Sequence, residues 1–98
     1  QHFAQRGRIG RLLMAVAQSP HLLGIGIDEN TALCVENDAA RILGSGAVTI
    51  LDGRGLDYVN VSELAPSEPL ALTDIRLHIL PQGYKFDLAA RRPIFNCR

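Results

Sequence analysis

The sequence predicts an α/β fold in which one helix is followed by several β-strands. The first periodic segment repeats apolar residues at helical spacing, whereas later segments are short, apolar and separated by glycine or polar turns. A helix that leads directly into a buried strand is typical of α/β architecture. With 98 residues, of which 47% are hydrophobic and 20% charged, the chain has the composition of a globular protein.

The helix is expected over residues 7–18. Its apolar residues follow the i, i+3, i+4, i+7, i+8 spacing of one buried stripe, and Ser19-Pro20 ends the pattern. The residues of this stripe are Ile9, Leu12, Leu13, Val16 and Ala17.

Residues 21–28 are expected to form a short buried strand. They are apolar on both faces, and Pro20 and the polar residues 28–30 leave no room for a helix. Gly24 and Gly26 lie two positions apart and share one face, so a helix or another backbone segment can approach closely there.

The polar residues Asp28, Glu29 and Asn30 follow this strand at its carboxyl end. In open α/β sheets, ligands bind at that end of the strands. Turns also favour Asp and Asn, so a polar turn leading into residues 31–36 explains the same residues equally well. The spacing alone leaves both interpretations open.

The second half is expected to be β-structure. Residues 40–43 and 47–51 predict a hairpin around the turn Gly44-Ser45-Gly46, and residues 52–55 supply the next reversal. Ser45 lacks the strand-elbow-helix context of a nucleophilic serine and is interpreted as a turn residue. A further strand is expected over residues 59–64.

The last predicted strand spans residues 72–80 and alternates in polarity. Ile75, Leu77 and Ile79 lie on one face, and the other face carries Asp74, Arg76 and His78. On this pattern His78 is expected to face solvent.

A basic cluster lies beside the start of the helix. It contains His2, Arg6, Arg8 and Arg11, and no acidic residue precedes Asp28. Cations at the positive amino end of a helix are unfavourable unless an anion lies nearby. Arg8 and Arg11 are three positions apart and can contact one ligand, which guanidinium groups hold with paired hydrogen bonds if it is a carboxylate or phosphate. We expect an anion-binding site with His2 as a titratable base; a solvated charged edge is the alternative.

The composition argues against several other classes. Ten basic and ten acidic residues give a formal net charge of zero, so we expect no nucleic-acid partner and no membrane partner. No apolar run is long enough to span a membrane, and the amino end has no signal-peptide core. Cys34 and Cys97 are too few and too far apart for a disulfide framework or a zinc site. We expect two free thiols, no metal and no cofactor.

Two blocks of the sequence resemble the cyanophycinases, serine peptidases related to aspartyl dipeptidase. The first is Gln1-His2-Phe3 followed by residues 6–12, and the second is LGIGIDENTA at residues 23–32. Residues 46–52 and 73–80 are also similar to this family. The resemblance implies a glutaminase-like (flavodoxin-like) three-layer sandwich, with residues 1–98 as a carboxy-terminal fragment of a single catalytic domain.

The resemblance also implies an activity and a set of site residues. The substrate is cyanophycin, a nitrogen-storage polymer of polyaspartate with arginine on each side-chain carboxyl, and the product is the β-aspartyl-arginine dipeptide. His2 corresponds to the triad base and Glu29 to its acidic partner, which fits the need of a serine hydroxyl for a base whose tautomer is fixed by a carboxylate. The nucleophilic serine lies upstream in this family, so the isolated chain is expected to be inactive. The substrate pocket corresponds to Gln1, Arg6, Arg8 and Arg11.

Two other functions stay open on the sequence. One is an aspartyl dipeptidase-like peptidase acting on small aspartyl peptides. The other is a non-catalytic anion-binding module, whose basic helix end holds an acidic partner. We expect a cytoplasmic bacterial protein, and the family resemblance is compatible with a homodimer.

Overall fold

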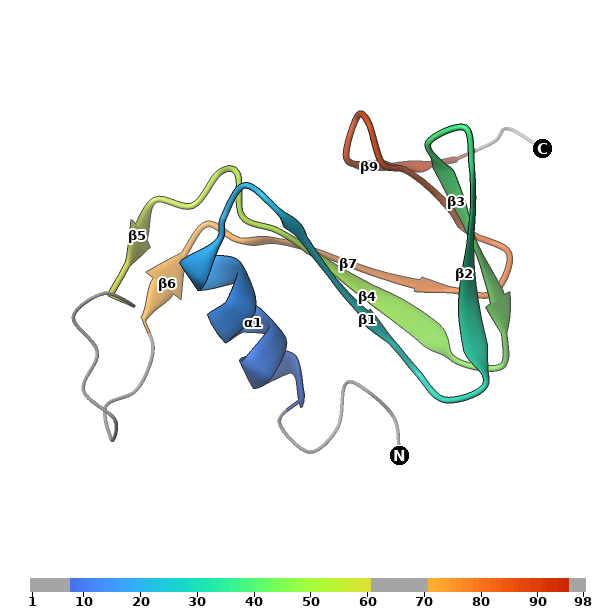
Figure 1. The fold of residues 1–98 in the computed structure, drawn as a ribbon, viewed down its shortest axis with the longest axis horizontal. Coiled ribbons are helices and arrows are strands. Elements are labelled where there is room, and N and C mark those ends of the chain that lie inside the picture. The colour runs from blue at the N-terminus through green and yellow to red at the C-terminus, as the bar shows by residue number, and fades with distance from the viewer. Residues whose placement is uncertain (1–7, 61–70, 96–98) are drawn as a thin grey trace.

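The computed structural model describes residues 8–60 and 71–95, and within them one helix precedes all of the strands (Figure 1). The helix begins one residue later than expected and ends where expected. The described elements are α1 (Arg8–Gln18), β1 (Leu23–Ile27), β2 (Thr31–Glu36), β3 (Ala39–Gly44), β4 (Ala47–Asp52), β5 (Tyr58–Val59), β6 (Leu72–Thr73), β7 (Arg76–Pro81), β8 (Lys85–Asp87) and β9 (Arg92–Ile94).

The strands form three sheets with the orders β1-β4-β7, β2-β3-β8-β9 and β5-β6. Every strand pairing described is antiparallel. The expected class, an α/β protein with one helix followed by several strands, is therefore confirmed. In the part of the chain that the structure describes, no helix has the length and apolarity needed to cross a bilayer.

Helix α1 packs against β1 at Gly24, where the sequence predicted that a helix could approach the strand closely. Val16 and Ala17 are buried on the helix side. A Cβ atom on Gly24 would lie 2.5 Å from Val16 Cγ2, closer than real Cβ atoms approach, and 3.1 Å from Leu12 Cδ1, a tight contact. The absence of a side chain at Gly24 therefore sets the distance between the helix and the sheet.

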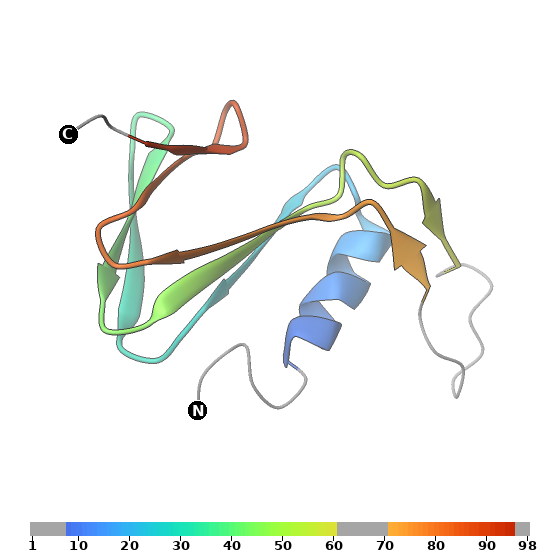
Figure 2. The same ribbon diagram turned by 180° about the vertical axis from the view of Figure 1, so that it is seen from behind.

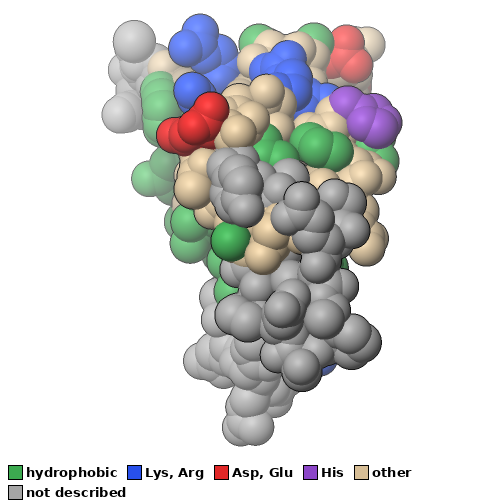
Figure 3. All heavy atoms as spheres, turned by 90° about the vertical axis from the view of Figure 1, so that its left-hand side faces the viewer, with side chains coloured by type: hydrophobic (Ala, Val, Ile, Leu, Met, Phe, Trp, Pro, Cys, Tyr) green, Lys and Arg blue, Asp and Glu red, His purple; other side chains and the backbone are tan. Residues whose placement is uncertain are grey.

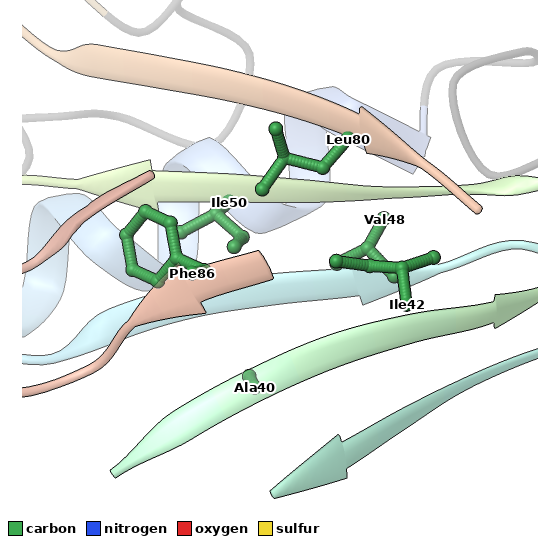
Figure 4. Packing of buried hydrophobic residues seen from close by; sticks show 6 residues of the cluster. All are labelled: Ala40, Ile42, Val48, Ile50, Leu80 and Phe86. Carbon is green, nitrogen blue, oxygen red and sulfur yellow. The ribbon is translucent and has the colours of Figure 1, made fainter. Parts of the chain in front are cut away.

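The hydrophobic core lies on the opposite face of the β1-β4-β7 sheet, where the β2-β3-β8-β9 sheet covers it (Figure 4). Gly24 pairs with Leu51 and Ile25 with Ile50, so the residue that contacts α1 and the residues that enter this core point to opposite faces. The helix and the two sheets thus form three successive layers. The buried core residues are Ala40, Ile42, Val48, Ile50, Leu80 and Phe86.

The predicted hairpin between residues 40–43 and 47–51 is wrong. Both segments are strands, but β3 pairs with β2 and β8, whereas β4 pairs with β1 and β7. Gly44 has a φ of 113°, and a Cβ atom there would collide with the carbonyl oxygen of Asn30. The glycine-rich link therefore carries the chain from one sheet to the other instead of reversing it within one sheet. Ser45 lies in this link between two strands, which confirms its interpretation as a turn residue.

The true hairpin joins β2 and β3 through Asn37 and Asp38. Both residues have positive φ angles, 52° and 65°. Positive φ at both central residues is the geometry of a type I′ turn, whose twist matches that of the flanking strands, and Asn and Asp tolerate it. The Asn-Asp pair was the local signal for this reversal.

The predicted strand over residues 72–80 is interrupted at Asp74, which has a φ of 63°. The segment forms β6 before Asp74 and β7 after it. Leu77 and Ile79 are 48% and 55% exposed, whereas His78 pairs with Ile50 and lies on the core side of the sheet. The expectation that His78 faces solvent is therefore wrong, because the second sheet covers the face of β7 that carries His78. The face with Leu77 and Ile79 is open, because α1 packs over β1 and β4.

The segment predicted as a strand over residues 59–64 lies mostly outside the described residues. Its first residue belongs to β5, which pairs with β6. The part of the prediction that falls on residues 61–64 is not described by the structure.

Candidate functional site

The six residues predicted for the active site fall into two groups. Gln1, His2 and Arg6 lie outside the described residues. Arg8 begins α1, although its side chain is not described, and Arg11 is exposed one turn further along. Glu29 is exposed in the turn between β1 and β2.

The beginning of α1 and the end of β1 lie on the same side of the molecule, which is the lower side in Figures 1 and 2. This follows from the chain path, since α1 leads through a short turn into β1, which runs back past the helix. The first turns of α1 and the turn that carries Glu29 therefore both lie on this side. The first turn of α1 contains no acidic residue, so the positive end of the helix has no compensating carboxylate within its own first turn.

The turn between β1 and β2 is fixed by hydrogen bonds to the link between β3 and β4. The Ala47 N–H donates to Asp28 Oδ2 at 3.0 Å, and the Asp28 N–H donates to the Ala47 carbonyl at 3.2 Å. The Gly46 N–H donates to Thr31 Oγ1 at 3.0 Å, and this hydroxyl donates to the Glu29 carbonyl at 2.9 Å. Asp28 thus has a structural role in a polar turn, and this turn holds the backbone of Glu29 in place.

A second polar site, which the sequence analysis missed, centres on Asp52. Its side chain is 7% exposed. It accepts hydrogen bonds from the Arg54 N–H at 3.0 Å and from Arg91 Nη1 at 3.2 Å, and Arg54 Nη2 lies 3.5 Å away. Arg91 Nη2 also donates to the His21 carbonyl at 2.6 Å. Asp52 and Arg91 are 39 positions apart, so no local pattern could have paired them.

The environment of Asp52 lowers its pKa from the ordinary value of 3.8. Burial raises the pKa, because it disfavours the charged form, but the hydrogen bonds from Arg54 and Arg91 and the two positive charges outweigh that effect. Asp52 is therefore ionised at neutral pH and holds both arginines.

His78 is the second ionisable side chain that the sequence analysis misplaced. Its ring packs against Phe86 with a centroid distance of 5.2 Å, and its buried Nε2 atom has no hydrogen-bond partner among the residues that the structure describes. Burial lowers the pKa of His78 below its ordinary value of 6.5, the Arg76 charge lowers it further, and Asp52 partly opposes this change. The imidazole is therefore held in its neutral form.

The buried position of His78 predicts that the protein loses stability as the pH falls. The pKa of His78 in the folded protein lies below the ordinary value of 6.5. The contribution of neutral His78 to the free energy of unfolding is therefore complete above pH 6.5. It is lost as the pH falls through the lowered pKa, because the unfolded state binds more protons in that range. Urea unfolding measured between pH 7.5 and the acid range should show this slope, and His78→Leu should remove it. His21→Gln, at an exposed loop histidine, is the matched control and should keep the slope; an identical slope in the His78 variant would contradict the assignment.

The described residues include the free thiol of Cys34 and no cluster suited to a metal ion. Among residues 8–60 and 71–95, no group of three or more His, Cys, Asp or Glu side chains is placed to hold a metal ion. Cys34 is a free, exposed thiol, and Cys97 lies outside the described residues.

The chain resembles one group of known proteins over nearly all of its length, although no protein-family model matches it. That group is the cyanophycinases. The chain is 42% identical to a cyanophycinase from Geminocystis herdmanii over 95 residues, 41% identical to one from Synechococcus elongatus over 98 residues, and 47% identical to one from Trichormus variabilis over 92 residues.

These matches cover 93–99% of this chain but only 30–35% of each relative. The chain therefore spans about a third of the length of the curated relatives that it matches. The resemblance to the cyanophycinase family that the two sequence blocks indicated is confirmed.

Proposed function

We propose that this chain is part of a serine-type peptidase that hydrolyses cyanophycin to β-aspartyl-arginine dipeptides. The observation that carries the proposal is the 41–47% identity to cyanophycinases over almost the whole chain. The relatives are about three times as long, so the remaining parts of the active site are assigned to sequence beyond the 98 residues.

We propose further that residues 1–98 form the carboxy-terminal part of a single catalytic domain with a glutaminase-like, flavodoxin-like sandwich. The support for this assignment is the sequence similarity to cyanophycinases, because the described layers are one helix and two antiparallel sheets. The exposed apolar side chains of Leu77 and Ile79 leave an outer sheet face that further elements of such a domain can cover.

In the proposed mechanism, His2 takes the proton of a serine hydroxyl supplied by the upstream part of the protein. Glu29 accepts a hydrogen bond from the imidazole, fixes its tautomer and stabilises the imidazolium. The described geometry supports this role for Glu29. Its exposed side chain stands in a turn that is held by hydrogen bonds and lies on the same side of the molecule as the start of α1.

The substrate pocket in this proposal is formed at the start of α1. A helix amino terminus without acidic residues in its first turn favours a substrate carboxylate, and Arg11 is exposed there. Guanidinium groups bind carboxylates with two hydrogen bonds, which a lysine cannot reproduce. The proposed pocket residues are Gln1, Arg6, Arg8 and Arg11.

The test is a hydrolysis assay on the longer protein that contains this chain. We expect release of β-aspartyl-arginine from cyanophycin, and none from the 98-residue chain alone. Cleavage of small aspartyl peptides without cleavage of the polymer would favour the aspartyl dipeptidase alternative. Binding of acidic ligands without any hydrolysis would favour the anion-binding module. The proposal includes a cytoplasmic location, which fractionation of the producing cells would test. It also includes a homodimer, which sedimentation of the longer protein would test.

A further inference from the structure

A polar cleft of about 600 Å³ is lined by none of the proposed site residues that the structure describes, Arg8, Arg11 and Glu29. It is bounded by the end of β4, the start of β7 and the turn between β8 and β9. Figure 3 shows basic side chains (blue) gathered at the upper end of one face of the molecule, with acidic side chains (red) beside them. The charged residues that line the cleft are Asp52, Arg54, Asp74, Arg76, Arg91 and Arg92.

One wall of the cleft is preorganised. Arg91 is fixed on the β8–β9 turn, where its N–H donates to the Asp87 carbonyl at 2.7 Å, and its guanidinium is tied to Asp52 and to the His21 carbonyl. Its side chain is only 18% exposed. Asp52 is thus neutralised within the protein, and its charge does not oppose an anion in the cleft.

The outer wall carries two arginines that are available to a ligand. Arg76 and Arg92 are both exposed, and among the described residues neither makes an ion pair. Arg76 lies opposite Asp52 in the β4–β7 register, so strand pairing fixes its backbone at the cleft. Two exposed guanidinium groups on one wall are suited to a carboxylate or a phosphate oxyanion.

The cleft also contains a negative group, which narrows the class of ligand. Four arginines and two aspartates give a formal charge of +2. Asp52 is engaged by Arg54 and Arg91, but Asp74 is exposed on the wall next to Arg76. An exposed carboxylate repels a phosphate dianion, and it attracts a cationic group on a ligand that also carries a carboxylate.

We propose that this cleft binds a zwitterionic peptide, whose carboxylate contacts Arg76 and Arg92 and whose cationic group contacts Asp74. The inference rests on the proposed function only in the choice of peptide, since aspartyl-arginine carries both kinds of group. The cleft is distinct from the start of α1, so it constitutes a second peptide-binding site on the same chain.

The experiment is isothermal titration calorimetry of the longer protein that contains this chain, at pH 7, with β-aspartyl-arginine dipeptide and, separately, with inorganic phosphate. Arg76→Gln and Arg92→Gln should each weaken dipeptide binding about tenfold, because each removes one bidentate contact. Arg41→Gln, at an exposed arginine outside the cleft, is the matched control and should change it little. Circular dichroism verifies that each variant is folded.

Asp74→Asn separates a zwitterion site from a simple anion site. Asn tolerates the positive φ of 63° at this position, so the backbone should be kept. We expect the variant to bind the dipeptide about tenfold more weakly and phosphate no more weakly than before. Stronger binding of both ligands, or phosphate binding as tight as that of the dipeptide in the unmodified chain, would overturn the proposal in favour of a general anion site.

The remaining outcomes also decide the question. Dipeptide binding that is abolished by Arg11→Gln but not by the cleft variants would place the ligand at the helix and overturn the inference, as would the absence of measurable dipeptide binding. No bond is cleaved in this measurement, because the dipeptide is the product of the proposed hydrolysis. Failure of the hydrolysis assay would therefore leave the binding result intact, and the two proposals can fail separately.

Discussion

His2→Ala in the longer protein is expected to reduce kcat by about three to six orders of magnitude. The proposed role of His2 is to take the serine proton and later to return a proton to the leaving group, and no other side chain substitutes for a missing triad base. Substrate binding and thermal unfolding should change little. Single-turnover kinetics on cyanophycin, with a separate binding measurement, would check both parts.

Two further variants make this test specific. His21→Ala is the matched control, because His21 is exposed and the structure uses only its backbone carbonyl, which accepts from Arg91. Glu29→Gln should lose activity less severely than His2→Ala, because the carboxylate acts through the imidazole; Glu36→Gln, exposed on β2, is its control. Near-normal turnover in a folded His2→Ala protein would exclude His2 from the mechanism.

Asp52→Ala is expected to lower the free energy of unfolding by about 2 to 4 kcal/mol. The substitution leaves the partly buried guanidinium of Arg91 without its carboxylate and removes the acceptor of the Arg54 N–H. Urea unfolding at pH 7 would measure the loss. In acid the unmodified protein should approach the variant, because the folded pKa of Asp52 lies below 3.8 and its stabilisation is lost as the pH falls through that pKa.

Controls for this prediction come from the same region. Asp57→Ala, at an exposed aspartate, should change stability by no more than about 0.5 kcal/mol. Arg54→Ala should cost less than Asp52→Ala, because the Arg54 side chain is 54% exposed and its ion pair is screened by solvent. A loss at Asp52 no larger than that at Asp57 would show that the buried network adds no net stability.

The parts of the fold that depend on local sequence were predictable. The apolar stripe and Ser19-Pro20 placed α1 to within one residue, and the two glycines of β1 anticipated the close approach of the helix at Gly24. Strand pairing could be predicted less well, because the sequence Gly44-Ser45-Gly46 is typical of a hairpin turn. Its role as a crossover depends on the distant contact of Gly44 with Asn30.

The core side of β7 could not be inferred from alternation alone. The apolar residues of that segment suggested a buried face, yet the packed face carries His78 and Leu80 because the second sheet covers it. The predicted site was accessible only through resemblance to a family. The structure positions Arg11 and the turn of Glu29, while the roles of His2 and of the other pocket residues stay predictions.

The contact between Arg91 and the His21 carbonyl joins positions 70 residues apart in the chain. It closes a loop that contains every strand from β1 to β8, and the chain entropy lost in closing so long a loop is offset by strand pairing and core packing within the loop together with the polar contacts made at that point. Arg91 thus connects the two ends of this segment much as a disulfide does, by restricting how far they can separate. Unlike a disulfide, this connection has no covalent bond and weakens when Asp52 is protonated.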